Sequence, residues 1–188
     1  MIWNDHKRLE GTHAYLSASS YHWLNYDEAK MRTTYTNHLK VQRGTELHDL
    51  AQRCIKLGVK LPRTKKTINM HVNDAISMNL DPEVLLYYSK NCYGTADAIG
   101  FDGRTLHIHD LKTGDTLAHM DQLHIYAAIF CLEYAIPPED ISFELRIYQS
   151  DECRVDVPES RKIREVMDKI IWLDSIIEDM RLNGNIAE

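Results

Sequence analysis

The most regular run of apolar and β-prone positions lies near the middle of the chain. Residues 92–100 and 104–112 have this character, and Asp102-Gly103 stands between them. An Asp-Gly pair between two such runs is a strong signal for a two-residue hairpin turn. The pattern therefore predicts a β-hairpin. Further strands are predicted at 83–90, which could be the third member of this sheet, at 141–149 and at 154–157.

Helices are predicted on both sides of these strands. The predicted segments are 17–42, with Ser17 or Ser19 as N-cap, then 44–57, 67–80, 118–134 and 159–182. Helices and strands thus occur in one mixed succession, which indicates an α/β protein. No repeat, low-complexity tract or linker divides the 188 residues. We therefore expect a single domain over 1–188 with a sizeable core.

Three polar side chains interrupt one face of the predicted hairpin. If Asp102 and Gly103 form the turn, Asp97 lies opposite Ile108 and diagonal to Asp110. Because side chains alternate between faces, Asp97, Asp110 and Lys112 then share one face. Neighbouring carboxylates repel unless a cation lies between them, and oxygen ligands suit Mg²⁺ or Mn²⁺. A lysine beside them can orient or deprotonate a water and offset charge on a phosphate.

Together these three residues indicate hydrolysis of a phosphodiester. The alternative is a surface salt bridge between one of the aspartates and Lys112. The backbone carbonyl of Leu111 is a further candidate ligand, because hard cations accept carbonyl oxygens. His107 and His109 are predicted to lie on the opposite face, away from a metal on the aspartate side.

The charge of the chain is unevenly distributed. The formal net charge is −6, which argues against a general polyanion binder, but residues 30–66 contain ten Lys or Arg and two Asp or Glu. A basic segment in an acidic protein indicates a directed track for a phosphate backbone. The candidate DNA-binding residues in this segment are Arg43, Lys60, Arg63, Lys65 and Lys66. The alternative is that this run is a solvated loop.

Composition excludes several other classes of protein. The four cysteines, Cys54, Cys92, Cys131 and Cys153, form no C-x-x-C pair, so we expect small buried residues and neither disulfides nor a zinc ribbon. The longest apolar run, 125–132, is too short to span a membrane. The first ten residues contain no apolar core of a signal peptide. We therefore expect a cytoplasmic protein without a membrane partner.

Four short motifs resemble those of one nuclease family. Asp97 followed by Asp110-Leu111-Lys112 resembles the PD-(D/E)XK signature. Gly44 to His48 resembles the upstream G-x-x-x-H element of its RecB-type exonuclease branch, and Gln122 to Tyr126 resembles the downstream Q-x-x-x-Y element. Ser17 to Ser20 resembles the usual start of that branch, which includes phage recombination exonucleases and nucleases of CRISPR adaptation.

This resemblance implies a fold, an activity and roles for particular residues. The fold would be a mixed central β-sheet flanked by helices, with a restriction-endonuclease-like αβββαβ core. The activity would be metal-dependent hydrolysis of DNA to 5′-phosphate and 3′-hydroxyl ends, with exonuclease action preferred. His48 would join Asp97, Asp110 and Leu111 around one or two Mg²⁺ or Mn²⁺ ions. Gln122 and Tyr126 would line the active site beside Lys112.

Three further expectations concern a cluster, the oligomeric state and a competing function. Some relatives in this branch carry a four-cysteine iron–sulfur cluster, but the spacing of the cysteines here differs, so no cluster is expected. A homo-oligomer that threads DNA fits an acidic protein with a local basic segment. The competing interpretation is a non-catalytic module, on a nuclease-derived fold, that binds DNA ends or a protein partner. The intact set of Asp97, Asp110 and Lys112 favours the enzyme.

Overall fold

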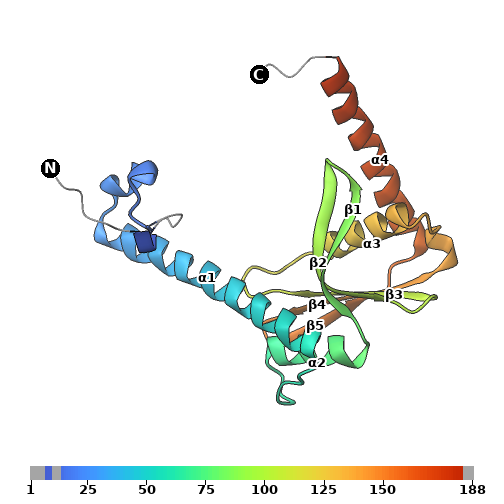
Figure 1. The fold of residues 1–188 in the computed structure, drawn as a ribbon, viewed down its shortest axis with the longest axis horizontal. Helices are drawn as coiled ribbons and strands as arrows, with labels where there is room; N and C mark the ends of the chain where they lie inside the picture. The colour runs from blue at the N-terminus through green and yellow to red at the C-terminus, as the bar shows by residue number, and fades with distance from the viewer. Residues whose placement is uncertain (1–6, 10–13, 184–188) are drawn as a thin grey trace. The chain divides into compact units, whose positions relative to one another are not determined.

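The computed structural model describes residues 7–9 and 14–183 (Figure 1). The chain divides into two compact units, Met1–Gln42 and Arg43–Glu188. The expectation of a single domain stays a prediction. Most of the first ten residues, where no signal-peptide core is expected, lie outside the described residues.

The first unit contains two short 3-10 helices, η1 (Lys7–Leu9) and η2 (Ala18–Asn25), and the first part of α1 (Glu28–Leu57). Ser17 caps η2, because its hydroxyl accepts a hydrogen bond from the Ser19 amide at 3.3 Å. The predicted division into helices 17–42 and 44–57 is wrong. A new helix starts after Asp27, which accepts the Lys30 amide at 2.7 Å. It then continues through Gly44, since one glycine costs a long helix only about 1 kcal/mol.

The second unit is built on a five-stranded sheet in the order β1-β2-β3-β4-β5. The pairs are antiparallel except for β3 and β4, which are parallel and are connected through α3. The predicted α/β architecture, a mixed sheet flanked by helices, is confirmed. The strands are β1 (Asp81–Ser89), β2 (Cys92–Phe101), β3 (Thr105–Leu111), β4 (Ser142–Gln149) and β5 (Glu152–Asp156).

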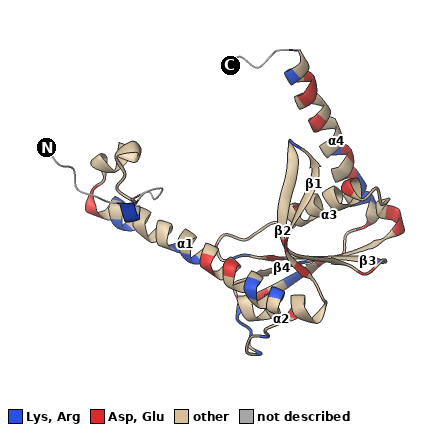
Figure 2. Cartoon of the chain, viewed as in Figure 1, with Lys and Arg blue, Asp and Glu red and all other residues tan. Residues whose placement is uncertain are grey.

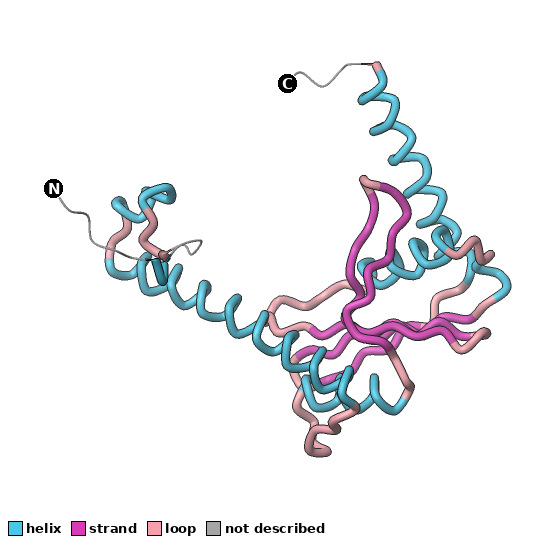
Figure 3. The backbone as a smooth tube through the Cα atoms, in the orientation of Figure 1, coloured by secondary structure: helices cyan, strands magenta, loops and turns pink. Residues whose placement is uncertain are grey.

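Helices cover both faces of this sheet (Figures 1 and 3). On one face lie α3 (Asp121–Glu133) and α4 (Ser160–Leu182), and on the other lie α2 (Thr67–Ser77) and the last turns of α1. The central strands β3 and β4 are therefore largely buried on both sides, with roughly 1.5–3 kcal/mol contributed by each fully buried large apolar side chain. The first face buries Ile108, Leu123, Ile129, Leu145 and Ile163, and the second buries Ala51, Ile55, Val72, Leu111 and Tyr148.

The turn between β2 and β3 is displaced by one residue from the predicted position. The Asp102 amide donates to the Thr105 carbonyl at 3.3 Å, which leaves Gly103 and Arg104 at the tip. The Asp102 carboxylate accepts hydrogen bonds from the amides of Arg104 at 2.8 Å and Thr105 at 2.7 Å. An aspartate that accepts amides two and three residues later belongs before the turn, and Gly103 supplies the positive φ of +90°.

This displacement changes the register of the hairpin. Ala98 pairs with His109, so the same register places Asp97 level with Asp110. The expected partner of Asp97, Ile108, pairs with Ile99 instead. The predicted register was wrong, but the prediction that both aspartates share a face does not depend on it. In this register the two positions are directly opposite each other instead of diagonal.

The second predicted helix of this unit ends earlier than expected, at Ser77 instead of residue 80. Asn79 has a φ of +54°, and its amide donates to the Ile76 carbonyl, while the Leu80 amide donates to Ala75. These are the two hydrogen bonds of a Schellman motif, and Asn79 occupies its left-handed position, a conformation that asparagine tolerates. The chain thus turns directly from α2 into β1.

Two further expectations concern the cysteines and the membrane. Cys54 and Cys131 are buried as expected, but Cys92 is half-buried and Cys153 is exposed. The prediction that all four cysteines are buried is therefore wrong. Within residues 7–9 and 14–183, no helix combines the length and the apolar character needed to cross a membrane.

Candidate metal centre

The centre of the site is Asp97 on β2. Its Oδ2 accepts a 2.7 Å hydrogen bond from the Leu111 amide at the end of β3. Its Oδ1 lies 3.3 Å from Nδ1 of His48 on α1. These contacts connect a helix and two strands through one carboxylate. His48 and Asp97, two of the predicted metal ligands, are therefore brought together from positions far apart in the sequence.

Gly44 allows α1 to approach the sheet at this point. A Cβ atom at Gly44 would lie 2.7 Å from Oγ1 of Thr113, which follows directly after Lys112. This is closer than real Cβ contacts, so a side chain here would push the helix and the loop apart. The glycine lies four residues, about one helical turn, before His48. The G-x-x-x-H spacing therefore has a structural explanation: the glycine allows the close approach of α1 that brings His48, one turn later, to Asp97.

Glu83 is a third member of the centre, and the sequence analysis missed it. Pro82 pairs with Ala98 and Val84 with Ala96, which places Glu83 level with Asp97 on the other side of β2. Glu83 has a φ of +54°, a left-handed conformation that costs a glutamate roughly 1–3 kcal/mol. No local motif signals this residue, because its position depends on the pairing of β1 with β2.

His48, Glu83 and Asp97 could together hold a metal ion. Each offers one ligand atom, and these atoms all lie within 4.8 Å of one another. Two carboxylates and an imidazole form a donor set suited to a divalent cation. The predicted ligand Asp110 is not a member of this group, and the role of the Leu111 carbonyl stays a prediction.

Asp110 is instead engaged by Lys112. Nζ of Lys112 lies 3.2 Å from Oδ1 and 3.1 Å from Oδ2 of Asp110. Asp110 is 2 % exposed, and apart from this ion pair its Oδ2 makes no hydrogen bond within the described residues. The ammonium group satisfies part of the negative charge of this buried carboxylate, and the lone pairs that it leaves could contact a metal ion.

The pKa values in the centre reflect its crowded negative charge. Burial and then the charge of Asp97 raise the pKa of Asp110, although Lys112 opposes this. The same two causes raise the pKa of Glu83. Burial also opposes ionisation of Asp97, but His48 and the Leu111 amide hold its pKa below the usual value. The hydrogen bond to Asp97 in turn raises the pKa of His48. A divalent cation would favour the ionised form of all three carboxyl groups.

A chain of hydrogen bonds connects this centre to α3. Nζ of Lys112 donates to Oε1 of Gln122 at 2.7 Å, and Nε2 of Gln122 donates to the Tyr126 hydroxyl at 3.1 Å. The hydroxyl donates to the Thr95 carbonyl at 2.7 Å. Gly94 leaves room for the ring, since a Cβ there would lie 2.9 Å from a Tyr126 ring carbon. Gln122 and Tyr126 lie one turn apart on the same face of α3, as the spacing predicts, and these hydrogen bonds connect both to Lys112.

The predicted DNA-binding residues separate into two groups. Arg43 and Lys66 line a pocket of about 540 Å³ that also contains Leu111 and Lys112, so this pocket adjoins the metal centre. The remaining three residues, Lys60, Arg63 and Lys65, line another pocket of about 480 Å³.

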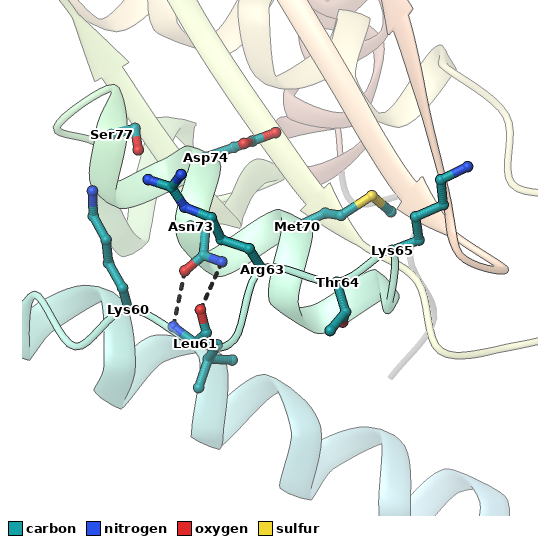
Figure 4. A pocket seen from close by; sticks show the side chains of 9 residues that line it. All are labelled: Lys60, Leu61, Arg63, Thr64, Lys65, Met70, Asn73, Asp74 and Ser77. Atoms are coloured by element: carbon teal, nitrogen blue, oxygen red, sulfur yellow. Dashed lines mark hydrogen bonds between the residues drawn. The ribbon is translucent and has the colours of Figure 1, made fainter.

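The loop that carries these three residues joins α1 to α2, where Figure 2 shows a concentration of Lys and Arg. In Figure 4, Asn73 forms hydrogen bonds with both the amide and the carbonyl of Leu61, at 2.9 and 3.0 Å, and these hold the loop against α2. Lys65 points away from Lys60 and Arg63. The loop is thus ordered by α2 while its basic side chains diverge.

The opposite face of the sheet carries a buried cluster of aromatic and imidazole rings. His109 packs against Tyr148 and, at 6.4 Å between ring centroids, faces His71. This places His109 away from the aspartates, as alternation predicts. Neither ring nitrogen of His71 has a hydrogen-bond partner within the described residues, and burial lowers its pKa to about 4.

Comparisons with protein-family models, with curated proteins and with solved structures found no match for this chain.

Proposed function

We propose that the protein is a divalent-metal-dependent DNA nuclease, and that it is an exonuclease of the PD-(D/E)XK type. The single observation that carries this proposal is the position of Lys112. Its ammonium group contacts Asp110 and Gln122, and the charge of Asp97, a member of the group of His48, Glu83 and Asp97, also acts on Asp110. A cation next to clustered carboxylates is suited to hydrolysis of an anionic ester, whereas a surface that only binds DNA gains nothing from carboxylates that face a polyanion.

In this proposal His48, Glu83, Asp97 and Asp110 hold one or two Mg²⁺ or Mn²⁺ ions. The histidine favours Mn²⁺, because imidazole is a softer ligand than a carboxylate. When bound, such an ion supplies charge stabilisation for the phosphate and makes a water more acidic. The carboxylates supply the charge that retains the ion next to a polyanion.

Lys112 acts on the attacking water and on the charge that develops at the phosphate. Gln122 fixes its ammonium group through the 2.7 Å hydrogen bond, and Tyr126 fixes Gln122 in turn. The water attacks phosphorus in line with the leaving 3′-oxygen, and the P–O3′ bond breaks. The oxygen of water stays on the 5′-phosphate, one of its protons reaches the 3′-oxygen, and the other is released to solvent. Lys112 and Gln122 position the reactants, and neither forms a bond to phosphorus.

The basic residues supply the track for the backbone of DNA. Arg43 and Lys66 share a pocket with Lys112 and would contact the phosphates next to the cleaved one. Lys60, Arg63 and Lys65 would extend the track along the loop before α2. A nuclease of this kind would act on DNA ends in recombination or DNA processing in the cytoplasm, and a homo-oligomer remains our expectation.

Cleavage of end-labelled DNA tests this proposal. Linear and closed circular DNA, single- and double-stranded, would be incubated with the wild-type protein and Mg²⁺, Mn²⁺ or EDTA. Lys112→Ala is the test variant, and Lys162→Ala, an exposed lysine on α4, is the matched control. We expect loss of linear DNA only with a divalent metal, with wild type and Lys162→Ala active and Lys112→Ala inactive.

Each other outcome has a defined meaning. Cleavage of circles as well keeps the chemistry and changes the mode to endonuclease. Equal activity of Lys112→Ala and Lys162→Ala would refute the role of Lys112. DNA binding without cleavage of any substrate would favour the non-catalytic module.

A further inference from the structure

The face of the β1–β2 hairpin that carries the metal centre continues beyond it. Side chains alternate along a strand, so the face that presents Glu83 and Asp97 next presents Leu85 and Thr95, which are paired. The following pair on this face is Tyr87 and Tyr93. Both tyrosines therefore lie in line with the centre, four residues further along each strand.

The two tyrosines are exposed and stacked on each other. Their ring centroids lie 6.3 Å apart with an angle of 25° between the planes. Tyr87 is 48 % and Tyr93 61 % exposed, and Leu85, between them and the centre, is 57 % exposed. The opposite face of the hairpin already supplies its packing, because Leu86 and Ala96 there are buried in the core. The core therefore does not explain the tyrosines.

This hairpin is held in place by the helices beside it. It extends away from β3 to β5 and lies along α4 (Figures 1 and 3). Glu133 on α3 accepts the Tyr87 amide at 2.8 Å. Near the hairpin tip, Ser89 and Asn91 donate to Asp174 on α4 at 2.6 and 2.8 Å. The tyrosine pair thus stands on a supported strand pair and not on a free loop, which reduces the entropy lost on binding.

We propose that Tyr87 and Tyr93 form a stacking platform for the bases of single-stranded DNA, and this inference rests on the proposed nuclease function. Aromatic side chains bind single strands because every unpaired base offers a π-face, whereas the bases of a duplex already stack on one another. The platform lies about 13 Å along the strand from Glu83, at roughly 3.3 Å per residue, which spans a few nucleotides.

Continuity with the metal centre favours this occupant over a protein partner. The pocket that contains Arg43, Lys66 and Lys112 adjoins the same metal centre and is suited to phosphates. The hairpin face has no lysine or arginine between Glu83 and Tyr87 or between Tyr93 and Asp97, so it is suited to bases. A single strand, with phosphates and bases accessible on opposite sides, can use both surfaces at once.

Binding in EDTA tests the platform without cleavage. Fluorescence anisotropy would compare labelled oligodeoxythymidylate, an abasic strand of equal length and a blunt duplex. The test variant is Tyr87→Ala/Tyr93→Ala, with the two single alanine variants alongside it, and thermal melts would verify their folding. The controls are Tyr87→Phe/Tyr93→Phe, which keeps both rings, and Tyr134→Ala, an exposed tyrosine at the end of α3.

We expect the double alanine variant to bind the thymidylate strand about 10- to 100-fold more weakly, and each single variant to account for part of this loss. The phenylalanine variant and Tyr134→Ala should bind like wild type, and the abasic strand should not distinguish the variants. Unchanged binding by the alanine variants would overturn the platform. An equal loss of affinity for the abasic strand in the alanine variants would also overturn it. The same holds if the duplex binds as tightly as the thymidylate strand and depends equally on the two tyrosines.

The platform and the nuclease fail separately. Tyrosine-dependent binding by a protein that cleaves no DNA supports the platform and refutes the nuclease. Metal-dependent cleavage by a protein whose alanine variants bind like wild type supports the nuclease and refutes the platform.

Discussion

Nζ of Lys112 donates a 2.7 Å hydrogen bond to Oε1 of Gln122, so the residue after β3 is oriented by the first turn of α3. Asp110 alone leaves the long lysine side chain free to rotate about the ion pair. The second contact, from a different element, fixes the direction of the ammonium group. The Q-x-x-x-Y element is thus explained as a support for the lysine.

Gln122→Leu should therefore reduce the rate of cleavage without abolishing it. The variant keeps the size of the side chain and removes the hydrogen bonds to Lys112 and Tyr126, and misplacement of a catalytic group by about 1 Å can cost on the order of 100-fold. We expect a 10- to 100-fold lower kcat with little change in DNA affinity, measured by single-turnover cleavage and by binding in EDTA. An unchanged kcat would show that Asp110 alone is sufficient to orient Lys112.

Glu83→Gln should weaken metal binding. It removes one of two carboxylate charges from the group of His48, Glu83 and Asp97 while keeping the size of the side chain. We expect at least about a tenfold higher Kd for Mn²⁺ by isothermal titration calorimetry. Glu152→Gln, on the exposed strand β5, is the matched control and should bind Mn²⁺ like wild type. Equal affinities of the two variants for Mn²⁺ would exclude Glu83 as a ligand of the metal ion.

Gly44→Ala should destabilise the protein through its contact with Thr113. The new Cβ would meet Oγ1 at 2.7 Å, and we expect a loss of about 1–2 kcal/mol in the free energy of unfolding by urea. In a Thr113→Ala background the same change should be neutral, or stabilising by up to about 1 kcal/mol, because alanine is the better helix former. Equal effects in both backgrounds would show that Thr113 does not limit the approach of α1.

His71 should make the fold sensitive to acid. Its pKa is lowered from 6.5 to about 4 by burial, so the unfolded chain binds a proton at a higher pH than the folded protein does. The free energy of unfolding is then unaffected at pH values above the pKa of His71 in the unfolded chain. It decreases as the pH falls from 6.5 towards 4, and at about pH 5 it is lower by about 2 kcal/mol.

Urea unfolding at neutral pH and near pH 5 measures this loss. His71→Phe keeps a ring against Tyr148 and should show a smaller loss, with the remainder due to His109, whose pKa burial also lowers. The same pH dependence in His71→Phe and wild type would exclude His71 as the cause.

The local parts of the site could be predicted from the sequence, because they depend on alternation and helical spacing. Asp110 and Lys112 are two positions apart in an extended segment at the end of β3, and Gln122 and Tyr126 are four positions apart on one helix. Each pair therefore faces one way whatever surrounds it. The hairpin was predicted from another local signal, the Asp102-Gly103 pair between two β-prone runs. Its register was not, since the Asp102 side chain displaces the turn by capping two amides.

The non-local parts could not be predicted. The sequence indicated 83–90 as a third strand of the sheet, but neither the register that brings Glu83 level with Asp97 nor its left-handed backbone conformation has a signal in the residues around it. The basic segment looked continuous in the sequence. Packing of α2 divides it, so that Lys66 lies in the pocket with Lys112 while Lys65, one residue earlier, lines the other pocket.

The most direct measurement is the rate at which wild type and Asp110→Asn degrade end-labelled linear single-stranded DNA in Mn²⁺. The asparagine keeps the shape of the buried side chain and removes the charge that Lys112 and a metal ion would share. We predict degradation by wild type that stops in EDTA, and a rate at least about a thousandfold lower for a folded Asp110→Asn protein. Equal rates for the two proteins, or degradation that continues in EDTA, would contradict the account.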